Sequence, residues 1–235
     1  MFYKYFILAL FLGSLLLAKE IGFEYEGVPV KTGEEKDKDE KGKNVYTIVK
    51  RDIPKECKNI PVTNTMLWTG NYANDKVPEA CKSTFVHTLG GHIFPMSIDQ
   101  DITTYGELEV LAFIKQMQTD DSMMLIDVCK EAFFAYRTIP GAVNMPFYHF
   151  KERESFAFEF EQHMRTLGVS INEKDDSLDF THAKTITLFC NGPWCSLSVL
   201  TIQALLEIGY PAEKINWYRG GMQEWLASGM TSTRK

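Results

Sequence analysis

The stretch TITLFCNGPWCSLSVLTIQALLEIGY, residues 185–210, decides the fold of this chain. Its first five residues have the β-branched and aromatic composition of a strand, and the Gly192-Pro193 pair that follows is typical of a turn. Beyond the turn, apolar residues recur at helical spacing, at Val199, Ile202 and Leu206. The stretch therefore predicts a strand, a short loop and an amphipathic helix.

Cys190 lies in the predicted loop, at the amino end of the helix. Unpaired backbone N–H groups and the helix dipole favour an anion at such a position. A cysteine there can have a pKa one or more units below its usual value of about 8.5 and react as a thiolate at neutral pH. We expect a thiolate at Cys190 and a helix capped by Ser196 or Ser198. The alternative is a free cysteine that only ends a buried strand.

Length and charge exclude some classes of protein. The 235 residues, 45% of them hydrophobic, suffice for one sizeable core with an extension. The net charge of -6 and the lack of a basic block with interleaved aromatic residues argue against a nucleic-acid-binding surface. Nucleic acid is therefore not expected among the partners of this chain.

Residues 1–18, MFYKYFILALFLGSLLLA, are typical of a secretory signal peptide. An early Lys4 precedes an uninterrupted apolar run, and the small Ala18 stands before charged residues. Leu16 occupies a position where a cleavage site usually has a small residue, so an uncleaved membrane anchor is the alternative. We expect an exported, periplasmic protein that contacts the membrane only if this segment is retained.

Export would suit a disulfide between Cys57 and Cys81, because disulfides persist in oxidising compartments. Two unrelated buried thiols are the alternative. The only closely spaced cysteines are Cys190 and Cys195, and no histidine stands at ligand spacing from them. The sequence therefore predicts neither a metal site nor a cofactor.

The first hundred residues differ in character from the rest. The charge run KTGEEKDKDEKGK, residues 31–43, interleaves both signs and predicts a solvated loop. Short apolar pieces broken by proline and glycine follow it. We expect a loop-rich N-terminal extension over 19–100, a folded domain over 101–230 and a short tail over 231–235.

Helical and strand patterns alternate in the predicted domain. Helical periodicity covers 104–119, 131–136 and 156–167, and strand composition covers 123–128, 185–189 and 215–218. Strands separated by helices indicate an α/β fold, with a mainly parallel sheet flanked by helices on both faces. Ligands of such sheets gather at the carboxyl ends of the strands, where Cys190 stands.

Three motifs, in this order, resemble landmarks of the rhodanese-like superfamily. LIDV at 125–128 with TIPGAVNMP at 138–146 is similar to the family's first strand and the start of its second. The loop around Cys190 is similar to its active-site loop, and WYRGGMQEW at 217–225 to its closing Gly-Gly and Trp pattern. The resemblance covers about 102–229, and the ordered set is more specific than any one motif.

The resemblance implies a sulfurtransferase, in which the loop cysteine takes up a sulfane sulfur as a persulfide and passes it to a thiol acceptor. Cys190 matches the nucleophile, and Asp127 matches a structural hydrogen-bonding residue. The backbone amides of the loop match the family's anion cradle, which here comprises Asn191, Gly192, Pro193, Trp194, Cys195 and Ser196. The implied partners are a small sulfur donor or a persulfidated protein, and a thiol acceptor or a thioredoxin-like protein.

The chain departs from rhodaneses that use thiosulfate. Those enzymes often have an Arg or Lys five residues after the nucleophile, where it helps to hold an anionic donor, and this chain has Cys195 there. We expect poor activity with thiosulfate and a persulfide as the preferred donor. Arg137 and Arg219 flank matched motifs and could supply a replacement cation, or could simply be surface arginines.

Alternatives from other functional classes stay open. Cys195 could resolve an oxidised Cys190 as a disulfide, which would make the chain a thiol-disulfide redox protein, or it could pack beneath the loop. The domain could also be a non-catalytic sulfur-binding or interaction module, in which Trp194 offers an apolar face to a partner. A phosphatase is disfavoured, because Ser196 stands where a phosphate-clamping arginine would be needed.

Overall fold

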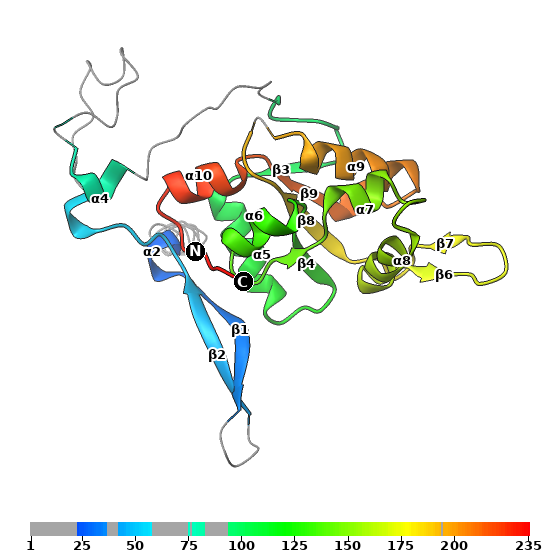
Figure 1. The fold of residues 1–235 in the computed structure, drawn as a ribbon, viewed down its shortest axis with the longest axis horizontal. Helices are drawn as coiled ribbons and strands as arrows, with labels where there is room; N and C mark the ends of the chain where they lie inside the picture. The colour runs from blue at the N-terminus through cyan, green and yellow to red at the C-terminus, as the bar shows by residue number, and fades with distance from the viewer. Residues whose placement is uncertain (1–22, 37–41, 58–74, 76, 83–93, 194) are drawn as a thin grey trace, which may run out of the picture.

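The structure of the chain is a computed structural model that describes residues 23–36, 42–57, 75, 77–82, 94–193 and 195–235 (Figure 1). The predicted signal segment 1–18 and Trp194 lie outside the described residues, so the expectations that concern them stay predictions.

A five-stranded parallel sheet forms the centre of the molecule, in the order β3-β9-β8-β4-β5. The strands are β3 (Thr103–Tyr105), β4 (Met123–Asp127), β5 (Val143–Asn144), β8 (Thr185–Phe189) and β9 (Ile215–Tyr218). β8 lies between β4 and β9, and the β4 and β8 strands are in register from Met123 opposite Thr185 to Asp127 opposite Phe189. Both strands therefore end at the same edge of the sheet.

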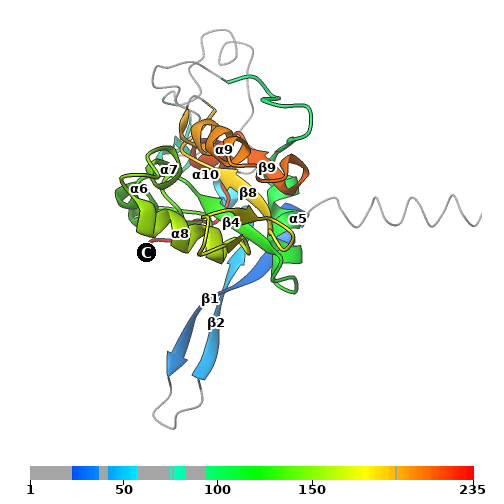
Figure 2. The same cartoon turned by 90° about the vertical axis from the view of Figure 1, so that its right-hand side faces the viewer.

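Helices cover both faces of the sheet (Figures 1 and 2). Five helices have these bounds: α5 (Glu107–Met117), α7 (Phe147–Lys151), α8 (Ala157–Thr166), α9 (Leu197–Glu207) and α10 (Gly221–Ala227). Ile186 and Leu188 of β8 belong to the core cluster beneath α7, α8 and α9, whereas Phe189 belongs to the cluster beneath α5 and α10. Side chains alternate across a strand, and here both faces are buried, which explains the almost continuous apolar run of β8. The predicted α/β fold is confirmed.

Shorter elements complete the domain. They are α6 (Glu131–Tyr136), the 3-10 helix η2 (Ala212–Lys214) and a small antiparallel pair of strands, β6 (Ser170–Ile171) and β7 (Leu178–Asp179). α6 follows β4 and lies at the edge of the sheet where β4 ends. No helix among the described residues is long and apolar enough to cross a bilayer.

The prediction of a loop is wrong for residues 31–36 and 42–43 of the charge run, and residues 37–41 lie outside the described residues. After the short helix α2 (Phe23–Glu26), the strands β1 (Val28–Lys36) and β2 (Gly42–Val49) form an antiparallel hairpin that projects away from the domain (Figure 2). Val28 and Val30 are buried together with Val49 in the core cluster that includes α5. Burial of these alternate residues anchors the base of the hairpin, and the charged stretch continues the same two strands outward.

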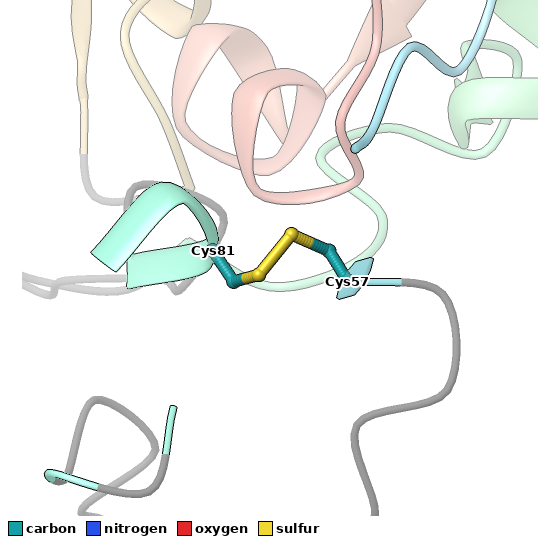
Figure 3. Close-up of a disulfide and its surroundings, with 2 residues drawn as sticks. All are labelled: Cys57 and Cys81. Atoms are coloured by element: carbon teal, nitrogen blue, oxygen red, sulfur yellow. A yellow bond between two sulfur atoms is a disulfide. The ribbon is translucent and has the colours of Figure 1, made fainter. Parts of the chain in front are cut away.

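A disulfide links two parts of the extension, and the C-terminal residues hold the extension to the domain. Cys57 of the 3-10 helix η1 (Lys55–Cys57) is bonded to Cys81 of α4 (Glu79–Lys82), with 5.6 Å between their Cα atoms (Figure 3). Of the two alternatives that the sequence leaves open for these cysteines, the structure has the disulfide. The backbone N–H of Thr231 donates to Lys50, so the predicted tail packs against the extension.

Candidate active site

The loop after β8 is held by the first turn of α10. The backbone N–H of Met222 donates to the carbonyl of Cys190 at 2.9 Å, and that of Gln223 donates to Asn191 at 2.8 Å. Gly221 has a φ of +54°, and a Cβ atom there would clash with the Cys190 carbonyl and lie 2.7 Å from the Gly192 nitrogen. Only glycine allows this approach, which gives the Gly-Gly motif a physical role at the site.

The sulfur of Cys190 is buried at the carboxyl edge of the sheet, and the residue is 1% exposed. The Cys190 thiol donates a 3.2 Å hydrogen bond to the carbonyl oxygen of Cys195, and its sulfur lies 3.5 Å from the hydroxyl of Ser198. Burial raises the pKa of Cys190 well above its usual value, and the contact with Cys195 adds to this. The expectation of a thiolate at Cys190 is therefore wrong, because desolvation outweighs the helix N-terminus.

Cys195 is the cysteine of this loop that is stabilised as a thiolate. Its pKa is lowered to about 6, mainly because the Cys190 thiol donates a hydrogen bond to it, and further because the backbone N–H groups of Leu197 and Asn191 face it. These interactions outweigh the opposing effect of burial. The two thiols titrate as one unit, so the low and the high pKa belong to the pair.

Ser198 connects the loop to the sheet and was expected only as a helix cap. Its hydroxyl oxygen accepts a 3.0 Å hydrogen bond from the indole N–H of Trp217. The hydroxyl hydrogen is left to donate toward Cys190, which favours the charged form of that sulfur. Ser196 is the residue at the start of α9, but its side chain makes no capping hydrogen bond. Trp217 in the closing motif is the one sequence signal that could have suggested the role of Ser198.

Asp127 fastens the turn after β4. Its carboxylate accepts hydrogen bonds from the Cys129 backbone at 3.0 Å and from the Thr138 hydroxyl at 2.8 Å, and the residue is fully buried. Burial raises the pKa of this carboxyl, although both hydrogen bonds oppose the shift. The side chain of Asn144 ties the same turn by donating to the carbonyls of Asp127 and Cys129. These contacts fit a structural part for Asp127.

Cys129 is a third buried thiol beside the loop. Its sulfur lies 3.4 Å from the side-chain oxygen of Asn191 and donates a hydrogen bond to it. Burial and the nearby charge of Asp127 raise its pKa, so this thiol stays protonated. Cys129 therefore helps to orient Asn191 and does not supply a nucleophile.

The predicted cradle of backbone amides is only partly available. Pro193 has no N–H, and the amide of Cys195 donates to the Gly192 carbonyl at 2.9 Å. The Asn191 amide faces the sulfur of Cys195 and not that of Cys190. The loop thus directs its hydrogen bonding mainly to the second cysteine.

A cavity of about 490 Å³ opens beside the loop. The described residues that line it are Phe133, Asn191, Cys195, Ser196 and Leu197. Phe133 of α6 is 54% exposed and forms an apolar wall. None of the described lining residues carries a fixed charge, and Cys190 is not among them.

The two arginines that were considered as replacement cations lie elsewhere. The Arg219 guanidinium donates to the carbonyl of Phe94 at 2.7 Å and lies 3.9 Å from the Glu224 carboxylate. Arg137 is exposed and lines a separate cavity of about 550 Å³ together with Asp52. In the described part of the chain, the structure does not bring either arginine to the cavity at the thiols. Nor does any cluster of His, Cys, Asp and Glu among those residues suit a metal ion.

Comparison with known proteins identifies a family for this chain. The sequence profile of the rhodanese-like domain matches residues 111–228, half of the chain. No curated protein matches the sequence.

Several solved structures align with the chain. A rhodanese with anions from E. coli is 20% identical, with a TM-score of 0.29, and the alignment covers 48% of this chain and 99% of that one. A rhodanese-related protein from Thermoplasma volcanium is 15% identical, with a TM-score of 0.32 and coverage of 52% and 95%. An uncharacterized protein from Saccharomyces cerevisiae is 21% identical, with a TM-score of 0.34 and coverage of 55% and 93%. The profile match over half of the sequence places this chain in the rhodanese-like domain family.

Proposed function

We propose that this protein is a sulfurtransferase that takes up a sulfane sulfur as a persulfide on Cys190 and passes it to a thiol acceptor. The observation that carries the proposal is the placement of Cys190 at the carboxyl end of the central strand, in hydrogen-bonding contact with a second thiol that faces a cavity. Membership of the rhodanese-like family supports the same chemistry.

The proposed reaction exchanges one sulfur atom without net oxidation. A donor persulfide R–S–SH loses its outer sulfur to Cys190, so an S–S bond to Cys190 forms while the bond to the donor breaks, and the donor leaves as R–SH. An acceptor thiol then takes the same sulfur and restores Cys190. The hydroxyl of Ser198, 3.5 Å away, favours the charged form of the Cys190 sulfur at each step.

The lining of the cavity supports a persulfide donor in preference to thiosulfate. An anionic donor would need a cation or several free amides, and the described lining offers an apolar wall and the thiolate of Cys195. Two negative charges at close range repel each other, which further disfavours thiosulfate. A low-molecular-weight persulfide or a persulfidated protein fits this lining better.

The test is uptake of sulfur by the purified full chain. The protein is incubated with glutathione persulfide or with thiosulfate, and peptide mass spectrometry locates any added sulfur. We expect one added sulfur in the peptide that contains Cys190, transfer of that sulfur to a thiol, and much slower loading by thiosulfate. Thiosulfate turnover equal to that with the persulfide would contradict the proposed donor class.

A thiol-disulfide redox protein is the second candidate. The proximity of Cys190 to Cys195, whose carbonyl oxygen lies 3.2 Å from the Cys190 sulfur, favours it. An internal disulfide after treatment with a donor, with no sulfur gained, would support this function instead. A chain that forms neither product would fit a non-catalytic module.

We also propose that the protein is exported and works in the periplasm. The Cys57–Cys81 disulfide supports an oxidising compartment. Cell fractionation of the full chain tests this location, and recovery of the protein in the cytosol with both cysteines reduced would contradict it.

A further inference from the structure

We infer that Cys195 is the sulfur that attacks the donor, and that Cys190 then receives the sulfane sulfur from it across the loop. The inference rests on the proposed function, because it assigns the first of two steps by which sulfur reaches Cys190. It reverses the roles that the sequence suggests, in which Cys195 only resolves or supports Cys190.

Cys195 is the more accessible of the two cysteines to a donor in the cavity. Cys195 lines the 490 Å³ cavity beside Phe133 and Leu197, whereas the described lining does not include Cys190. Cys195 is 6% exposed and Cys190 is 1% exposed, so a donor in the cavity meets Cys195 before it meets Cys190. Direct attack by Cys190 would need the loop to open, because its sulfur is enclosed by the Cys195 carbonyl and Ser198.

The surroundings of the Cys195 sulfur favour negative charge on it. The Cys190 thiol and the backbone N–H groups of Asn191 and Leu197 converge on the Cys195 sulfur, and its pKa is lowered to about 6. The other titratable groups that affect the pair are Asp127 and Cys129, which disfavour negative charge nearby. A thiolate is the attacking species in thiol exchange. We therefore expect Cys195 to attack the donor while Cys190 is still protonated.

The two steps balance without an oxidant. The Cys195 thiolate attacks the outer sulfur of R–S–SH, which forms a Cys195 persulfide and releases R–S⁻. Cys190 then attacks the outer sulfur of that persulfide, which forms the Cys190 persulfide and breaks the bond to Cys195. The proton of Cys190 passes to the departing Cys195 sulfur, which it already contacts. The reverse of these steps delivers the sulfur to an acceptor thiol in the cavity.

The order of reaction is tested first on the unaltered protein. Limiting iodoacetamide is added across a range of pH, and peptide mass spectrometry measures the rate of alkylation at each of the three free cysteines. We expect Cys195 to react at least about tenfold faster than Cys190 at pH 7, with a midpoint near pH 6. Alkylation of Cys190 ahead of Cys195 would overturn the inference.

Sulfur loading of variants tests the relay itself. Cys195→Ser should slow loading of Cys190 by at least about tenfold, while Cys190→Ser should still gain a sulfur on Cys195. Cys129→Ser is the matched control for loss of a buried thiol and should keep both the alkylation order and the loading rate. Normal loading of Cys190 in Cys195→Ser would overturn the inference and leave the proposed function intact. If the unaltered protein takes up no sulfur at all, the proposed function fails, and the alkylation order still decides which thiol attacks.

Discussion

Cys57 and Cys81 join two short elements of the extension by a covalent bond, whereas Cys190 and Cys195 of the loop after β8 are free thiols. The first pair lies where η1 and α4 are only a single turn each. The second lies in a core cluster, between β8 and α9. The reduced pair is positioned by hydrogen bonds from α10 and from the Ser198-Trp217 contact.

The difference shows two uses of cysteine in one chain. Where little apolar surface is buried, a covalent link limits the freedom of the unfolded segment and substitutes for a core. Where the core already fixes the backbone, no link is needed, and the thiols remain available for chemistry. Changes to the disulfide, to the two free thiols and to the loop that holds them should therefore have different effects.

The largest effect is expected when Cys190→Ser and Cys195→Ser are combined. Because these two residues carry the transferred sulfur in the proposed reaction, turnover from a persulfide donor to a thiol should fall by at least about a thousandfold. Turnover is measured with glutathione persulfide, and near-ultraviolet circular dichroism checks that the variant is folded. A loss of less than tenfold would show that the sulfur is carried elsewhere.

Removal of the disulfide should affect stability and not chemistry. Cys57 and Cys81 are 24 residues apart, and opening such a loop costs about 3 kcal/mol in the chain-entropy treatment. We expect Cys57→Ser with Cys81→Ser to make the extension more sensitive to limited proteolysis, while the rate of sulfur loading at the loop stays the same. A matching loss of loading would mean that the two regions are coupled.

Gly221→Ala should damage the loop through its backbone. The positive φ alone costs about 1–3 kcal/mol for a residue with a side chain, and the clash with the Cys190 carbonyl adds to this. Urea unfolding measures the loss. Gly33→Ala is the matched control, because a Cβ there meets nothing within 4 Å, and it should change stability by less than about 0.5 kcal/mol. Equal stability of both variants would contradict the close approach at Gly221.

The smallest effect is the dependence of loading on pH. Cys195 loses its charge as the pH falls through about 6, so the rate should drop about twofold from pH 7 to pH 6 and about tenfold from pH 7 to pH 5. The sign follows from a lowered pKa, since the thiolate is present above that value and is lost below it. Initial rates in one buffer series measure this. A rate that keeps rising from pH 7 to pH 9 would indicate attack by a thiol of ordinary or raised pKa.

The centre of the fold was predictable from sequence because it depends on local patterns. The apolar run before Cys190 and the Gly-Pro turn predict β8, the loop and α9, and the helix predicted at 131–136 has the bounds of α6. The hairpin β1-β2 was missed because its charges conceal the inward alternation of Val28 and Val30, which matters only once α5 packs against it.

The distribution of charge between the two cysteines could not be predicted from sequence. A helix N-terminus is visible in the sequence, but the burial of Cys190 and its contact with Cys195 arise from tertiary packing. The same holds for Arg219, whose guanidinium is engaged by the Phe94 carbonyl, more than a hundred residues away in the chain. Residue type and spacing predicted the loop, and the fold determines how deeply its two sulfurs are buried and which residues line the cavity.

Sulfur transfer by the loop is tested most directly by peptide mass spectrometry of the unaltered protein after brief exposure to glutathione persulfide. The account predicts one added sulfur in the peptide that carries the loop, and its loss when an acceptor thiol is added. No added sulfur at Cys190 or Cys195, with both thiols still free and the protein folded, would contradict it.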